Sequence, residues 1–304
     1  MHALALVRWV GALVSRRPRV AHVQVTDTGI IRDVAYVALA GVCRTPVVSH
    51  VHSTGFFGVS TARRDRALRW IARHSDAVIV LSEALRARLS ADLGSPRSER
   101  VAYLANPLPP LDEPAPLQTE TGRRAFRILT VGEISADKGQ PAVGRIVDEL
   151  RAAGEDCILE LVGPWGAVNR QDRDRLESSE AVELAGVLRG AEKTRAYDRA
   201  DVFVLFSNRE AQPLVLLEAM SRGLPVIATG TGGVPDMLAE ATGNRIVPVG
   251  AVDALKTAIT EFLRAAPAER ARVGAQNRRF VEDRCGVPQH LSALVDMYRR
   301  VSAS

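Results

Sequence analysis

The stretch SNREAQPLVLLEAMSRGLPVIATGTGG, residues 207–233, decides the fold. Polar residues lead into a run with apolar side chains at helical spacing, and Gly-Leu-Pro at 223–225 ends that run. A short apolar segment and more glycines follow. The pattern predicts a loop, then a helix with Pro213 at its first position, then a strand, which is a repeating unit of a parallel α/β sheet.

Two carboxylates flank the start of this predicted helix. Glu210 lies in the loop before it, and Glu218 lies about four residues inside, about 6 Å along the axis. Free amides near Leu214 and Val215 can hold an anion such as a diphosphate. Carboxylates also accept hydrogen bonds from vicinal sugar hydroxyls, so a nucleotide sugar fits this pattern. The spacing fits a helix-capping and an exposed glutamate equally well, and both interpretations stay open.

Short apolar runs alternate with helical patterns along the chain, which predicts parallel sheets with right-handed crossovers. The proline-rich segment 111–124 is typical of a linker. The sequence therefore predicts an α/β protein with two Rossmann-like domains that face a cleft, at 1–110 and 125–285, and a final helix at 286–304. We expect strands at 20–25, 47–52, 77–81, 101–104, 127–131, 158–162, 182–184, 202–205, 226–228 and 246–249.

Composition excludes a disordered or membrane-spanning chain. Hydrophobic residues make up 46% and charged residues 25% of the 304 residues, and no apolar run reaches the ~20 residues that span a bilayer. The apolar start, interrupted by Arg8, indicates a half-buried helix rather than a signal peptide. Three widely spaced cysteines, Cys43, Cys157 and Cys285, indicate reduced thiols and a cytoplasmic protein.

Positive charge gathers in the first half. Residues 1–110 hold 15 arginines and 7 acidic residues, a net charge of +8. This balance suits an anionic partner or a solvated arginine-rich surface, and no motif supports nucleic acid. The predicted helix 63–73 carries five arginines with Leu68, Trp70 and Ile71. It fits either an anionic membrane surface, at the inner face of the membrane, or the protein core.

Candidate ligand-binding residues follow the predicted strands, because ligands bind at the carboxyl ends of parallel strands. Gly132 and Lys138 follow the strand at 127–131, and Gly163 follows the strand at 158–162. Glycine lets a ligand approach the backbone, and a lysine beside a helix start supplies a charge for phosphate. Each feature alone also fits an ordinary turn.

Together these segments resemble the family-4 retaining glycosyltransferases, which have the GT-B fold. The resemblance rests on the two glutamates followed by AMSRGLPVIATGTGGVPD, on VGEISADKG and on YDRADVFVLFSNRE. In the first half, PVVSHVHSTGFF resembles the family's strand that ends in a histidine near the reaction centre. Members of this type build polysaccharides and lipid-linked glycans.

The resemblance implies a role for each matching residue. Lys138 is expected to bind the donor diphosphate, Glu210 the donor sugar and leaving phosphate, and Glu218 the ribose. Gly132, Gly163, Pro213, Leu214 and Val215 are expected to line the donor site. His52 is expected beside the reacting sugar, with His50 packed away from it, since we expect only one of the two to face the cleft. No metal or cofactor is expected, and Asp172 and Asp174 are assigned to a charged helix face.

Three departures from the family pattern leave the activity open. Glu133 stands where the family has a basic residue, and Ala211 stands where it has glycine. The chain starts in a helix rather than in a strand and glycine-rich loop, which implies a first domain that is short relative to the family. The resemblance implies sugar transfer from a nucleoside diphosphate to a glycan, lipid-linked or small-molecule hydroxyl. The alternatives are a non-catalytic nucleotide-sugar-binding subunit and an epimerase.

Overall fold

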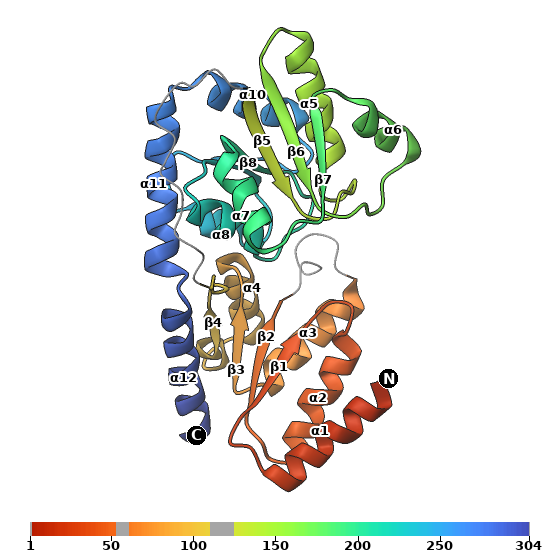
Figure 1. Ribbon diagram of the computed structural model, residues 1–304. Helices are drawn as coiled ribbons and strands as arrows, with labels where there is room; N and C mark the ends of the chain where they lie inside the picture. Colours follow the sequence, from red (N-terminus) through yellow and green to blue (C-terminus); the bar gives the residue numbers. More distant parts are fainter. Residues whose placement is uncertain (1, 53–60, 110–124, 304) are drawn as a thin grey trace. The chain divides into compact units, whose positions relative to one another are not determined.

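The computed structural model describes residues 2–52, 61–109 and 125–303, and it divides into two compact units (Figure 1). Unit 1 comprises Met1–Pro107 and Val287–Ser304, and unit 2 comprises Leu108–Gly286. The predicted linker at 111–124 lies outside the described residues. The final helix, α12 (Val287–Ala303), therefore belongs to the first unit, although it follows the second in sequence.

Unit 1 is a parallel four-stranded sheet in the order β1-β2-β3-β4. Helices alternate with the strands, as the sequence predicts. The elements are α1 (His2–Arg16), β1 (Ala21–Val25), α2 (Ile30–Val42), β2 (Val47–Val51), α3 (Ala62–His74), β3 (Ala77–Val80), α4 (Glu83–Leu93), the 3-10 turn η1 (Arg97–Arg100) and β4 (Val101–Tyr103).

The two faces of this sheet pack against different helices. One face forms a core with α1 to α4 through side chains such as Val23, Val37 and Leu68. The other face packs on α12 through Val48, Ile79 and Met297. Burial on both faces explains why the inner strand β3 is a continuous apolar run.

Helix α3 packs its apolar side into the core of unit 1. Leu68 and Ile71 are 2% and 0% exposed and lie in the unit 1 core, so its apolar side is not free to enter a bilayer. Its arginines lie on the outer side, where Arg69 pairs with Asp92. The prediction of a half-buried first helix agrees with α1, in which Leu13 is buried and Leu4, Val7 and Val14 are exposed. No helix within the described residues is long and apolar enough to cross a membrane.

Unit 2 is a parallel six-stranded sheet in the order β10-β9-β8-β5-β6-β7. Its first part comprises β5 (Phe126–Val131), α5 (Gln140–Ala152), β6 (Cys157–Val162), α6 (Arg170–Ser178), β7 (Val182–Gly186), α7 (Gly190–Arg199) and β8 (Val202–Leu205). Its second part comprises α8 (Leu214–Ser221), β9 (Val226–Thr229), α9 (Val234–Leu238), β10 (Arg245–Val247), α10 (Val252–Arg264) and α11 (Pro267–Arg284). All ten predicted strands are present, and their ends differ from the prediction by at most two residues.

The strand order places the candidate site. β5 lies between β8 and β6, so the loops after these three strands emerge side by side at one edge of the sheet. The loop after β5 carries Lys138, and the loop after β8 carries Glu210, 72 residues later. Because β8 and β5 are neighbours in the sheet, the loops that follow them lie close together although they are distant in sequence.

Candidate active site

Two glycines let the loops after β5 and β6 cross closely. Gly132 and Gly163 have φ angles of 148° and 149°. A Cβ on Gly163 would overlap the carbonyl oxygen of Gly132, and the Gly132 amide donates to the Val162 carbonyl over 2.8 Å. Gly163 is therefore required by the close approach of two backbones, whereas a Cβ on Gly132 would meet nothing within 4 Å and only its positive φ angle favours glycine.

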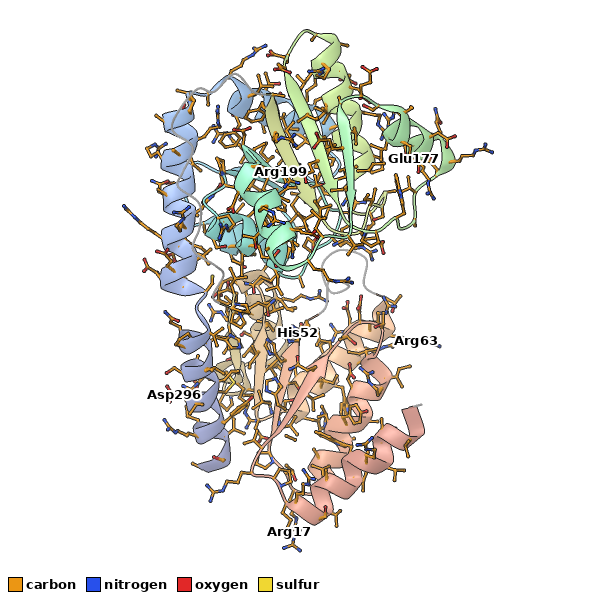
Figure 2. All side chains as sticks on the ribbon, in the orientation of Figure 1. Arg17, His52, Arg63, Glu177, Arg199 and Asp296 are labelled. Atoms are coloured by element: carbon orange, nitrogen blue, oxygen red, sulfur yellow. The ribbon has the colours of Figure 1, made fainter. Side chains whose placement is uncertain are left out.

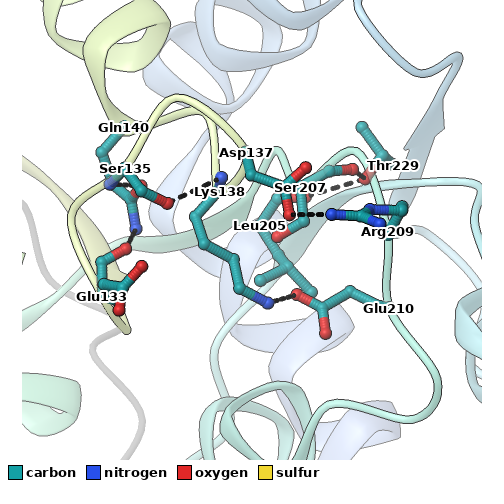
Figure 3. A network of polar contacts seen from close by, with 10 residues as sticks. All are labelled: Glu133, Ser135, Asp137, Lys138, Gln140, Leu205, Ser207, Arg209, Glu210 and Thr229. Atoms are coloured by element: carbon teal, nitrogen blue, oxygen red, sulfur yellow. Dashed lines mark hydrogen bonds and ion pairs between the residues drawn. The ribbon is translucent and has the colours of Figure 1, made fainter. Parts of the chain in front are cut away.

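The loop after β5 is fastened to the first residue of α5. The Gln140 side chain accepts from the Ser135 amide over 3.2 Å and donates to the Glu133 carbonyl over 3.0 Å. The Lys138 amide donates to the Ser135 hydroxyl over 3.3 Å. Gly139 has a φ angle of 77°, and a Cβ there would overlap the Phe206 carbonyl oxygen. These contacts fix the backbone from which the Lys138 side chain extends (Figure 3).

Lys138 and Glu210 form an ion pair. The Lys138 Nζ lies 2.6 Å from Glu210 Oε1, and the side chains are 33% and 8% exposed. Figure 3 shows the ammonium group reaching the carboxylate across the ends of the two loops. A second link joins the same loops, because the Asn208 amide donates to the Asp137 carbonyl over 2.8 Å. The structure thus brings together Lys138, which the resemblance assigns to the donor diphosphate, and Glu210, which it assigns to the donor sugar and leaving phosphate.

The glycine-rich loop after β9 packs against the backbone of Glu210 and Ala211. Gly232 has a φ angle of 60°, and a Cβ there would overlap the carbonyl oxygen of Glu210. The neighbouring Gly233 amide donates to the Ala211 carbonyl over 2.6 Å. Thr229, at the end of β9, donates to the Ser207 carbonyl over 2.5 Å. The loop that carries Glu210 is therefore held by backbone contacts that a side chain at position 232 would disrupt.

The helix after this loop begins one residue later than predicted. Its first residue is Leu214, and Pro213 is the N-cap with an extended ψ angle of 118°. Pro213 thus precedes the first turn, where its lack of an amide hydrogen leaves no donor unsatisfied. Leu214 is exposed and Val215 half-buried, so the first turn of α8 is accessible beside the Glu210 loop.

Glu218 is held by two residues that the sequence did not single out. The Lys193 Nζ lies 2.8 Å from its Oε1 and 2.6 Å from its Oε2, and the Tyr197 hydroxyl donates to Oε2 over 2.7 Å. Both partners come from α7. Burial and the Glu218 charge hold the pKa of Tyr197 well above its usual range, which keeps its hydroxyl a donor. The only signal in the sequence was their spacing of four residues on one face of a predicted helix.

Glu133 turns away from Lys138 rather than pairing with it. Its side chain is exposed and lies over Gly166, where a Cβ would overlap its carboxyl group. Glycine at 166 therefore makes room for the acidic side chain that departs from the family pattern. Asp172 and Asp174 lie on α6, where Asp172 pairs with Arg145 and Arg175, and Asp174 with Arg170.

His52 belongs to a histidine cluster in unit 1. The rings of His50 and His52 are 3.9 Å apart, and the ring of His22 is 5.5 Å from that of His50. Residues two apart in a strand lie on the same face, so the side chains of His50 and His52 lie side by side, and the expectation that they point apart was wrong. His50 is buried and His52 half-buried.

Neighbouring groups keep these imidazoles neutral. Burial and the adjacent His52, His22 and His290 lower the pKa of His50 to about 2. Burial, with His22 and His290, also lowers the pKa of His52. The Tyr298 hydroxyl lies 2.5 Å from Nδ1 of His22. Burial therefore favours the neutral form of His22, His50 and His52, and the Nε2 atoms of His22 and His50 are buried without a hydrogen-bond partner among the described residues.

Family models match both halves of the chain. The model for glycosyl transferases group 1 matches residues 125–265, and that for the glycosyl transferase 4-like domain matches residues 1–107. The chain belongs to the group 1 glycosyltransferases. The resemblance noted in the sequence is therefore confirmed.

Curated relatives of this glycosyltransferase family member include three named transferases. The sulfoquinovosyl transferase of Arabidopsis thaliana is 36% identical over 37% of the chain and 21% of the relative. A GDP-mannose-dependent phosphatidylinositol monomannoside mannosyltransferase of Mycolicibacterium smegmatis is 27% identical over 80% of the chain and 67% of the relative. The alpha-D-kanosaminyltransferase of Streptomyces kanamyceticus is 26% identical over 67% of the chain and 57% of the relative. The chain thus matches between about a fifth and two thirds of their lengths.

Solved structures give the same fold. HepE of Anabaena in complex with UDP has a TM-score of 0.76 at 17% identity, over 97% of this chain and 82% of that one. Sucrose-phosphate synthase of Thermosynechococcus elongatus has a TM-score of 0.77 at 20% identity, over 98% and 77%. The predicted GT-B fold class is confirmed. The short first domain stays a prediction.

Proposed function

We propose that the chain transfers a sugar from a nucleoside-diphosphate sugar to an acceptor hydroxyl with retention of configuration. The observation that carries this proposal is the Lys138–Glu210 ion pair at the carboxyl ends of β5 and β8, beside the accessible first turn of α8. A cation, a carboxylate and free helix amides at one sheet edge fit a diphosphate and the sugar attached to it.

In the proposed reaction, the bond between the anomeric carbon and the diphosphate oxygen breaks, and a bond to the acceptor oxygen forms on the same face. The transition state resembles an oxocarbenium ion, as in glycoside hydrolysis. Negative charge gathers on the departing diphosphate, where Lys138 and the α8 amides would stabilise it. The acceptor proton passes to the leaving phosphate, so the reaction requires no dedicated base.

The ion pair gives Lys138 and Glu210 a shared role. When the Lys138 ammonium group pairs with a bound diphosphate instead of with Glu210, the Glu210 carboxylate becomes free to accept hydrogen bonds from sugar hydroxyls. Glu218, held by Lys193 and Tyr197, would accept from the ribose hydroxyls. His52 would contact the reacting sugar as a neutral imidazole. No metal or cofactor is assigned to the reaction.

The acceptor and setting are part of the proposal. We place the protein in the cytoplasm, at the inner face of the membrane where a lipid-linked or glycan acceptor is presented. The free thiols of Cys43, Cys157 and Cys285 agree with a reducing compartment. The names of the mannosyltransferase relatives refer to phosphatidylinositol mannosides as acceptors for those proteins.

Donor turnover tests the proposal. The purified chain is incubated with a panel of UDP- and GDP-sugars, and released nucleoside diphosphate is measured for the natural protein, Lys138→Met and Glu210→Gln. We expect release with one donor class and a loss of at least about a hundredfold in each variant. Saturable nucleotide-sugar binding without release would favour the non-catalytic alternative, to which the Glu133 carboxylate lends support. Neither binding nor release would overturn both.

A further inference from the structure

A basic groove runs along the edge of the unit 1 sheet where the strands begin. One cavity of about 950 Å³ and an adjoining cavity of about 700 Å³ share Arg44, Thr45 and Pro46 in their linings. Ligands of parallel α/β sheets bind at the opposite, carboxyl edge. In Figure 2, Arg17 and His52 lie at opposite ends of unit 1. The groove is therefore separate from the proposed reaction site.

Topology concentrates positive charge in this groove. Arg19 lies just before β1, Arg44 before β2 and Arg100 before β4. Because parallel strands begin at the same edge, these side chains gather there. Arg17 follows α1, and Arg300 reaches the groove from α12. The two acidic residues in the linings, Asp76 and Glu99, leave the groove with a net charge of +3.

Most of these arginines have no protein partner. The side chains of Arg17, Arg19, Arg44 and Arg300 make no hydrogen bond or ion pair with the part of the chain that the structure describes. Arg127, Arg199 and Arg222 of unit 2 are examples of arginines that are instead paired with carboxylates. The guanidinium groups of the groove are therefore available to an external anion.

Backbone strain supports a role for two of them. Arg17 and Arg44 have φ angles of 42° and 53°, and they are the two non-glycine residues with positive φ in the described ranges. Arg17 directly follows the end of α1, and Arg44 lies two residues after the end of α2. Glycine is the usual residue at such helix ends. Arginine in this conformation is strained, whereas glycine adopts it without steric conflict. Strained residues that gather at one cavity indicate a binding function there.

We propose that this groove binds a ligand that carries more than one phosphate group. Planar guanidinium groups bind phosphate oxygens in pairs, and arginines from several elements can contact phosphates at more than one point. The volume of the two cavities exceeds what a single phosphate requires. The phosphates could belong to a phospholipid headgroup surface or to a soluble phosphorylated molecule, and the test below separates these sources.

The test replaces both strained arginines with glycine, which the backbone prefers. The Arg17→Gly/Arg44→Gly variant should be at least as resistant to urea as the natural chain, so that loss of binding cannot be attributed to unfolding. The matched control is Arg63→Gln/Arg66→Gln, which removes the same charge from exposed positions on α3 outside the groove. Inorganic tripolyphosphate is titrated into each protein by calorimetry.

We expect tripolyphosphate affinity to fall at least about tenfold in the groove variant and to stay within about twofold in the control. Equal affinity in the two variants, or no binding by the natural chain, would overturn the proposal. Any tripolyphosphate at the Lys138 site contributes equally to all three proteins.

Sedimentation with phosphatidylglycerol–phosphatidylcholine vesicles identifies the source of the phosphate groups. If the groove variant binds the vesicles more weakly than the natural chain does, the ligand is a lipid headgroup. If the two proteins sediment with the vesicles equally, the ligand is a soluble molecule.

Discussion

The ammonium nitrogen of Lys138 lies 2.6 Å from a carboxylate oxygen of Glu210, although 72 residues separate them in sequence. The carboxylate is almost fully buried, and the lysine is one-third exposed. A buried carboxylate needs such a partner, because an unpaired charge in this environment is costly to desolvate. The pair therefore stabilises unit 2 as well as presenting both groups to a ligand.

The first prediction concerns this coupling. We expect Lys138→Met to lower the free energy of unfolding by about 1–3 kcal/mol, because Glu210 is left buried without its partner. Glu210→Gln should restore part of that loss, giving a coupling free energy of about 1 kcal/mol or more in a double-mutant cycle. Urea denaturation of the four proteins measures it.

The control pair is Lys256 and Glu149, whose charged atoms are 2.7 Å apart and whose side chains are 42% and 58% exposed. Its coupling should stay below about 0.5 kcal/mol, since solvent screens exposed pairs. Equal coupling in the two cycles would show that burial of Glu210 does not strengthen its ion pair.

The second prediction concerns the positioning of Glu218. Lys193→Met and Tyr197→Phe each remove one hydrogen-bond partner of its carboxylate, so the carboxylate should turn away from the ribose. We expect each change to reduce the preference for UDP or GDP over the 2′-deoxy analogue by about tenfold, the value of a charge-assisted hydrogen bond. Calorimetric titration of each nucleotide and its analogue gives the ratio.

Arg195→Gln is the control, because it removes a charge from the exposed side of the same helix. It should keep the natural preference. Glu218→Gln separates two failures. If it retains the preference, the ribose role of Glu218 is wrong. If it loses the preference while the α7 variants keep it, the positioning role of α7 is wrong.

Sequence reasoning recovered central strands such as β3 and β8 because they are continuous apolar runs that are buried on both faces. The edge strands β1 and β7 contain exposed residues and were recovered from shorter apolar segments. Cys157 and Phe126, which were missed, extend two strands by one residue where burial continues past the obvious run. The order of the strands, and hence the meeting of Lys138 and Glu210, depends on how crossover helices pack. That information is not local, so both residues were identified but their ion pair was not.

Other features of the site also depended on tertiary packing. Lys193 and Tyr197 look like ordinary helix residues until α7 is placed beside α8. The histidines of β2 were assigned to opposite roles by an incorrect use of strand periodicity, and the ring separation of 3.9 Å corrects it. The aspartates of α6, in contrast, were assigned to a charged helix face from the local run of acidic and basic residues, and the structure pairs them there with Arg170 and Arg175.

The third prediction concerns the glycine behind Glu210. Gly232→Ala would place a methyl group into the carbonyl oxygen of Glu210, so the Glu210 loop must shift. We expect a loss of stability of more than about 2 kcal/mol, which exceeds the left-handed strain alone, together with weaker nucleotide-sugar binding. Thermal unfolding and donor titration measure the two effects.

Gly250→Ala is the matched control. Gly250 has a similar φ angle of 75°, but a Cβ there meets nothing within 4 Å. The Gly250→Ala variant should lose only about 1–2 kcal/mol of stability, through the strain of a left-handed alanine, and it should keep nucleotide-sugar binding. A Gly232 variant that behaves like the Gly250 variant would show that the Glu210 loop is not held by this contact.

The fourth prediction concerns acid stability and the histidine cluster of unit 1. His50 is 4% exposed, and its pKa is lowered from 6.5 to about 2 by burial and by the adjacent His52, His22 and His290. The unfolded chain therefore binds a proton at this residue below about pH 6.5, whereas the folded chain does not. The stability that neutral His50 contributes is complete above pH 6.5 and is lost progressively as the pH falls from there toward 2.

We expect the free energy of unfolding to fall by up to about 1.4 kcal/mol per pH unit for His50 in this window. His22 and His52, whose pKa values are also lowered, should add to the slope. His50→Leu removes the titrating group and fits the apolar neighbours Val48 and Ile79, so it should flatten the dependence between pH 7 and pH 5. His74→Gln, at an exposed position on α3, should leave the slope unchanged. If His50→Leu has the same slope as the natural chain in urea titrations, protonation of the buried cluster does not limit acid stability.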